Sequence, residues 1–150
     1  MFDIESKKPN NITIKTNTKT INFDLDNSEI DADLKVGKIH GPGEFEIGEA
    51  TIRGISSKDK TKTVYEVEVG GVKIGIIGDC EDVLDELDEP CILCTSSVRA
   101  IREVSPRLVV ATGNVDGMVT ELKLTATTDK HYKVKNADAL PASTEVVVLN

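Results

Sequence analysis

The sequence is poor in aromatic and histidine side chains. Its 150 residues include no tryptophan and only two histidines, and aromatics make up 3% of the chain. Because hydrophobic residues still make up 39%, the core must be built from valine, isoleucine and leucine, which favours β-rich packing. A chain of this length is expected to form one domain, residues 1–150, around a single core.

The sequence also has no excess of basic over acidic residues and no long apolar runs. Lys and Arg number 18 against 26 Asp and Glu, so the net charge is −8. An anionic surface repels phosphate backbones, and nucleic acid is therefore not expected as a partner. No apolar run approaches the roughly 18 residues that span a bilayer, and the N-terminal MFDIESKKPNN has no apolar signal segment, so no membrane association is expected.

Cysteine is scarce and odd in number. Three cysteines do not form a disulfide framework, so a reducing compartment, the cytoplasm, is expected. Cys91 and Cys94 have the spacing of half a zinc site or a redox pair, for which Cys80 would have to supply a third thiolate. Ile92 and Leu93, however, place the pair in an apolar strand, so buried structural thiols are the interpretation.

Alternating apolar residues predict a β-meander in the first half of the chain. ITIKTNTKTINFDL predicts a hairpin with TNTK as its turn. GPGEFEIGEATIRGI predicts a second hairpin that turns at Gly48-Glu49, and TVYEVEVGGVKIGIIGD a third that turns at Gly70-Gly71. The last of these strands is apolar almost throughout, as a strand covered on both faces would be.

From residue 81 the sequence alternates helical and strand patterns. EDVLDELDE predicts a helix over residues 81–89, SSVRAIREVSP a serine-capped helix that stops before Pro106, and DGMVTELKL a third helix. PCILCT, RLVVATGN, HYKVK and EVVVLN predict strands. A sheet with helices on one side and a second sheet on the other is a layered α/β domain.

Four of these segments together resemble the metallo-β-lactamase-fold hydrolases. GPGEFEIGEATIRGI, VYEVEVGGVKIGIIGD, SPRLVVATGN and YKVKNADALPASTEVVVL follow in that superfamily's order, and are most similar to its small ascorbate-6-phosphate-lactonase-like branch. The resemblance implies an α+β fold, a layered αββα sandwich, here truncated and with a β-rich N-terminal half. It also implies a His-x-His-x-Asp-His loop and further His and Asp ligands, which hold one or two metals that activate water.

Most ligand positions that the resemblance implies are missing from this sequence. Residues 25–40 (LDNSEIDADLKVGKIH) stand where the His-x-His-x-Asp-His loop would be. Lys58 lies where a mid-chain histidine is expected, and Gly113, beside Asn114, replaces the late histidine. Only Asp79 matches a family ligand, the Asp that ends a central strand. One carboxylate does not hold zinc at useful affinity, so no cofactor is expected.

Asp79 itself is expected to be a buried carboxylate without a metal. Such a group needs hydrogen-bond donors, which Lys58 or neighbouring loop amides would supply. Asp79→Ala is then expected to cost about 1–3 kcal/mol of stability.

Other candidate residues have a structural interpretation. His40 flanks the turn at residues 41–44 and is interpreted as a histidine that bonds to the backbone, whereas His131 begins a late strand and is expected to be exposed. The turn lacks the Lys and Ser/Thr of a P-loop. The serine pairs at 56–57 and 96–97 have no nearby histidine in sequence to activate them.

Three functions follow, of which the first is favoured. It is a noncatalytic pseudoenzyme, a structural or protein-interaction module that forms a homo-oligomer, because the truncation should leave apolar strand surface uncovered near residues 25–40. The alternative is a metal-dependent hydrolase with a site rebuilt around Asp79, His40 and Cys80, with zinc or another divalent metal as cofactor. The third is a ligand-binding pseudoenzyme that keeps the cleft without the chemistry.

Overall fold

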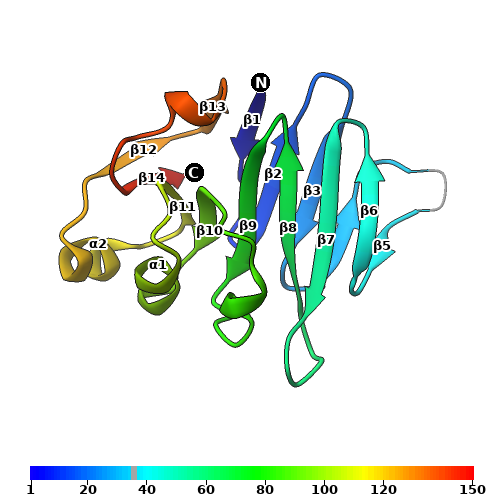
Figure 1. Ribbon diagram of the computed structural model, residues 1–150, viewed down its shortest axis with the longest axis horizontal. Coiled ribbons are helices and arrows are strands. Elements are labelled where there is room, and N and C mark those ends of the chain that lie inside the picture. Colours follow the sequence, from blue (N-terminus) through cyan, green and yellow to red (C-terminus); the bar gives the residue numbers. More distant parts are fainter. Residues whose placement is uncertain (35–36) are drawn as a thin grey trace.

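The chain folds as two packed β-sheets with helices over one of them (Figure 1). The computed structural model describes residues 1–34 and 37–150. The first sheet is six-stranded, in the order β13-β1-β2-β3-β4-β5. Its strands are β1 (Phe2–Glu5), β2 (Asn11–Lys15), β3 (Thr20–Asp24), β4 (Glu29–Asp31), β5 (Ile39–His40) and β13 (His131–Val134).

The second sheet is eight-stranded, in the order β12-β14-β11-β10-β9-β8-β7-β6. Neighbours from β6 to β9 are antiparallel, and those from β9 to β12 are parallel. The strands are β6 (Gly43–Ile47), β7 (Ala50–Ser56), β8 (Thr63–Val69), β9 (Val72–Gly78), β10 (Ile92–Thr95), β11 (Leu108–Thr112), β12 (Ala126–Asp129) and β14 (Glu145–Leu149).

The three predicted hairpins are confirmed. In the first, Ile12 lies opposite Phe23 and Ile14 opposite Ile21, so the alternating apolar residues share one face. In the third, Gly70 and Gly71 have φ of 56° and 79°. A two-residue turn with positive φ at both positions matches the twist of the flanking strands, which explains why glycines connect β8 to β9.

Two of the three predicted helices are confirmed, α1 (Val98–Val104) and α2 (Asp116–Leu122). At the start of α1 the Ser97 hydroxyl accepts a hydrogen bond from the Ala100 amide, as an N-cap residue does. The other elements are the short 3₁₀ turns η1 (Leu84–Glu86) and η2 (Ala137–Ala139). Among the described residues, no helix is long and apolar enough to cross a membrane.

The prediction of a helix over residues 81–89 is wrong, because only η1 forms there. Val83 and Leu84 are buried, as their spacing predicted, but side chains of the sheet hold the backbone around them. The Arg53 guanidinium donates to the Glu86 carbonyl, and the Asp88 amide donates to the Glu66 carboxylate. These bonds replace the i to i−4 bonds of a helix.

The apolar side chains separate the molecule into layers. One core lies between the two sheets, and two smaller clusters lie between the eight-stranded sheet and the helices. The outer face of the six-stranded sheet is polar: Thr13 donates to Asn22, which donates to Asn11. Within the described ranges no helix covers this face (Figure 1), so the second helical layer of an αββα sandwich is not observed.

The segment at residues 25–40, where the sequence resemblance implied a metal-binding loop, adds strands to the first sheet. Residues 35–36 lie outside the described residues, but in the rest of 25–40, β4 pairs with β3 and β5 with β4. Ile30 and Ala32 are buried, and Leu25 and Ile39 pack against the core. Among the described residues, Met1 is the one large hydrophobic side chain that is exposed. In the described part of this segment the expectation of uncovered apolar surface is therefore wrong, because its apolar side chains pack against the core.

Candidate functional site

A cleft runs along the rim of the sandwich, where the parallel strands of the eight-stranded sheet end. Gly78, Thr95 and Thr112, the last residues of β9, β10 and β11, line it on one side, and Asn10 and Leu25 line the other. The part between the sheets has a volume of about 100 Å³, and the part beside β9 about 180 Å³. The carboxyl ends of parallel strands are where α/β sheets place their ligand sites.

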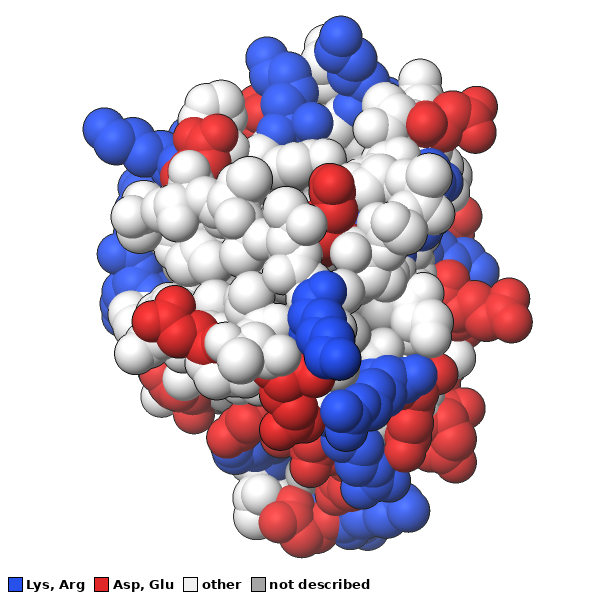
Figure 2. Space-filling model, turned by 90° about the vertical axis from the view of Figure 1, so that its left-hand side faces the viewer, with Lys and Arg blue, Asp and Glu red and all other residues white. Residues whose placement is uncertain are grey.

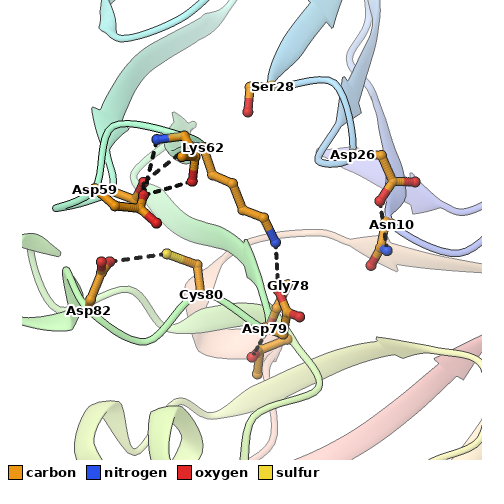
Figure 3. Close-up of polar contacts among 12 residues, drawn as sticks. Asn10, Asp26, Ser28, Asp59, Lys62, Gly78, Asp79, Cys80 and Asp82 are labelled. Carbon is orange, nitrogen blue, oxygen red and sulfur yellow. Dashed lines mark hydrogen bonds and ion pairs between the residues drawn. The ribbon is translucent and has the colours of Figure 1, made fainter.

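Asp79 lies at the mouth of this cleft, directly after β9 (Figure 3). Gly78 has a φ of 60°, and its turn takes the chain out of the strand. The Asp79 side chain is 78% exposed, and its Oδ1 lies 3.4 Å from the Lys62 Nζ. The expectation of a buried Asp79 held by Lys58 is therefore wrong: the carboxylate faces solvent and pairs with Lys62.

A tight turn at residues 57–62 holds Lys62 over the cleft. The Asp59 carboxylate accepts hydrogen bonds from the amide and hydroxyl of Thr61 and from the hydroxyl of Ser57. These bonds lower the pKa of Asp59 to about 2, and those from Thr61 contribute most. Lys58 is exposed, and its amide donates to Asp82 at 3.0 Å. The turn therefore directs Lys62, not Lys58, toward Asp79.

Two of the three cysteine side chains lie in environments that disfavour the thiolate. Burial, together with a 3.3 Å hydrogen bond to Asp82, raises the pKa of Cys80. Cys94 is buried in the core, and burial raises its pKa to about 12. Cys91 is only partly buried, so the interpretation of buried thiols holds for Cys94 but not for Cys91, whose thiol donates to the Lys73 carbonyl at 3.4 Å. Since the thiolate is the nucleophile and metal ligand, neither Cys80 nor Cys94 is prepared for those roles.

The remaining candidates lie elsewhere or have local partners. His40 lies in β5 at the far edge of the first sheet, 65% exposed, with its Nδ1 3.4 Å from Glu29. His131 likewise lies 3.5 Å from Asp3. The Asn114 Oδ1 accepts a hydrogen bond from the Asp116 amide at the start of α2. His40 is not among the residues that line the cleft beside Asp79 and Cys80, so the structure does not assemble the rebuilt site.

The described residues do not fit the metal that the sequence resemblance implies. The described part of the chain contains no group of three or more His, Cys, Asp or Glu side chains that could hold a metal ion. At Asp79, the position that resembles a family ligand, the Lys62 ammonium already supplies the positive charge. A second cation placed there would be repelled by the first.

Sequence reasoning missed Lys62 and Asn10. The Asn10 side chain donates to Asp26 at 3.0 Å across the cleft from Asp79 (Figure 3). The backbone of Asn10 has a φ of 61°, which asparagine tolerates better than most residues. The signal for Lys62 was the preceding Asp59-Lys60-Thr61, since an Asp that bonds its own backbone two residues later marks a turn.

The sequence matches no family model and no curated protein, but its fold has a solved counterpart. A crystal structure from Thermotoga maritima, described as a candidate Zn-dependent hydrolase of the metallo-beta-lactamase superfamily, superposes with a TM-score of 0.72. The match covers 99% of this chain and 98% of that chain at 16% identity. This chain therefore has the metallo-β-lactamase fold, as the sequence resemblance predicted. Both chains are covered almost entirely, so they have similar lengths.

Asp79→Ala is now expected to change the free energy of unfolding by no more than about 0.5 kcal/mol, since an exposed carboxylate in a surface ion pair contributes little. Asp24→Ala is the matched control. Asp24 is only 9% exposed and accepts bonds from Asp26 and Asn27, so its loss should cost about 1–3 kcal/mol. Urea unfolding measures both, and equal losses would show that Asp79 has structural partners.

Proposed function

We propose that this chain is a noncatalytic metallo-β-lactamase-fold protein, a pseudoenzyme that serves as a structural or protein-interaction module and associates with itself. The observation that carries the proposal is the ion pair between Lys62 and Asp79 at the one position that resembles a family metal ligand. Its three free cysteines fit a reducing compartment, and we place its action in the cytoplasm.

Two hydroxyl groups near the cleft are engaged in structural hydrogen bonds, which supports a noncatalytic role. The Thr95 hydroxyl donates to the Gly78 carbonyl at 2.6 Å, and the Ser97 hydroxyl caps α1 and bonds to Glu81. An activated serine needs a general base within hydrogen-bond reach, usually an imidazole. Both histidines of this chain pair with carboxylates of the first sheet instead.

The volume of the cleft supports this proposal over ligand binding within the cleft itself. Sites that enclose small molecules have volumes of about 300–1,000 Å³. The two parts of this cleft measure about 100 and 180 Å³, and they share Asn10, Leu25 and Gly78. The cleft is therefore too small to enclose a substrate of ordinary size, and contact with another protein is the function that we favour.

A turnover assay tests the noncatalytic part of the proposal. The protein, supplied with zinc, manganese or iron(II), is assayed on a lactone, a phosphodiester and a β-lactam, with Asp79→Ala and Cys80→Ser as matched variants. We expect rates equal to those of buffer with metal alone. Metal-dependent turnover that disappears in either variant would contradict the proposal and support the rebuilt hydrolase site.

A further inference from the structure

The outer edges of the two sheets are protected unequally. Each sheet ends in strands whose outward backbone groups can pair with another chain, and proteins block such edges with charges or short strands. Edge strand β6 carries exposed Glu44 and Glu46, β13 carries exposed Lys133, and β5 is two residues long. In β12 the residues before Asp129 are Ala-Thr-Thr, without charge. Strand β12 is therefore the least protected edge in the described structure.

The surface around β12 is also exposed and largely uncharged. All four residues of β12 are exposed. Figure 2 shows the side of the molecule that carries α2 and β12, where uncharged surface is interrupted by a few acidic and basic side chains and the charged groups are densest toward the bottom. Val119 and Leu122 of α2 are only partly buried. For a chain with a net charge of −8, such an area is where a like-charged copy is repelled least.

The backbone of β12 shows which groups point away from the sheet. The Thr125 carbonyl accepts from the Val146 amide at 2.9 Å, and the Asp129 carbonyl from the Asn150 amide at 3.1 Å. Backbone groups of successive residues in a strand alternate in direction. Thr125, Thr127 and Asp129 therefore face β14, and the N–H and C=O of Ala126 and Thr128 face outward.

From this pattern we propose that β12 pairs antiparallel with β12 of a second copy about a two-fold axis, so that the eight-stranded sheets join. This inference rests on the self-association in the proposed function and identifies the strand through which two copies would associate. With Thr127 opposite Thr127 of the second copy, Ala126 lies opposite Thr128 in both directions. Each such pair exchanges two backbone hydrogen bonds, using the outward groups of both residues.

The same register is free of like-charge contacts. Asp129 lies opposite Thr125 of the second copy, and Lys130 opposite Leu124. The central Thr127 pair is of a kind that stabilises antiparallel sheets. Self-pairing of β6 would instead bring Glu44 and Glu46 close to the same residues of another copy, and like charges facing each other destabilise a sheet. Both the backbone and the charges thus favour β12 as the contact.

Light scattering over a concentration series from micromolar upward tests the contact. Thr128→Pro removes an outward N–H that β14 does not use, and Thr128→Lys adds the charge that protects natural edges. Thr51→Lys is the matched control, since Thr51 is also an exposed strand threonine but lies in β7, inside the sheet. We expect a dimer for the wild type and Thr51→Lys, and at least about tenfold weaker association for both Thr128 variants.

The outcomes separate the inference from the proposed function. A wild-type dimer that both folded Thr128 variants leave intact would overturn the β12 contact but not self-association. A monomeric wild type would overturn both, while the turnover assay would still decide the noncatalytic claim. Circular dichroism and melting temperatures confirm folding, and if Thr128→Pro fails to fold, Thr128→Lys alone decides.

Discussion

Replacement of Arg107 by alanine is expected to lower the free energy of unfolding by about 2–4 kcal/mol. The half-buried guanidinium donates to the carbonyls of Ala137 and Leu140, each at 2.7 Å, and of Pro141 at 2.9 Å. It therefore attaches the segment between β13 and β14 to the start of β11. Hydrogen bonds from a charged donor contribute about 1.5–3 kcal/mol each, and water replaces part of them in the variant.

Two variants serve as controls for this prediction. Arg107→Lys should lose an intermediate amount, because one ammonium does not reproduce the fork of donors that reaches three carbonyls. Arg102→Ala removes an exposed arginine of α1 whose partner, Glu121, is 3.4 Å away, so a change within about 0.5 kcal/mol is expected. Urea unfolding compares the three variants, and similar losses at Arg107 and Arg102 would refute the role of the carbonyl contacts.

Replacement of Glu66 by alanine is expected to cost about 2–4 kcal/mol. Glu66 is only 8% exposed, and its carboxylate accepts from the Arg53 Nη2 at 2.8 Å and from the Asp88 amide at 2.7 Å. Its removal leaves the partly buried Asp88 amide without its acceptor and the partly buried guanidinium without its counterion. The segment around η1 should then exchange its amide hydrogens faster, because Glu66 and Arg53 hold it against the sheet.

A double-mutant cycle isolates this contact. Glu66→Ala, Arg53→Ala and the double variant should show a coupling energy of about 1–2 kcal/mol, since the pair is in direct contact. Glu68→Ala is the matched control, because Glu68 is an exposed glutamate on the same strand. Additive losses, or equal losses at Glu66 and Glu68, would show that the η1 segment is held by its apolar residues alone.

The elements that the sequence predicted are those determined by local interactions. The Gly70-Gly71 turn and the Ser97 cap depend on neighbouring residues, so their hairpin and helix could be placed from the sequence. The segment at 81–89 could not, because its conformation depends on Glu66 and Arg53 from other strands. Strand β12 was missed because all its residues are exposed, so it has no alternation of buried and exposed positions to detect.

The sequence indicates where the candidate site lies but not which residues contact one another there. The resemblance identified Asp79 and the absence of family histidines, which are properties of the sequence. The partner of Asp79 depends on the turn at Asp59, which directs Lys62 to the carboxylate and leaves Lys58 exposed. The strands that residues 25–34 and 37–40 add to the first sheet were missed, since β4 and β5 are too short for a periodic signal.

The metal content of the protein tests the central claim most directly. Protein purified without chelator, and a second sample incubated with excess zinc and then desalted, are analysed by mass spectrometry for zinc, iron and manganese. The Lys62 ammonium lies 3.4 Å from Asp79, and no histidine is among the described residues that line the cleft beside it. We therefore expect well under one metal per chain in both samples, and the same values for Asp79→Ala. One metal per chain that disappears in Asp79→Ala would contradict the account.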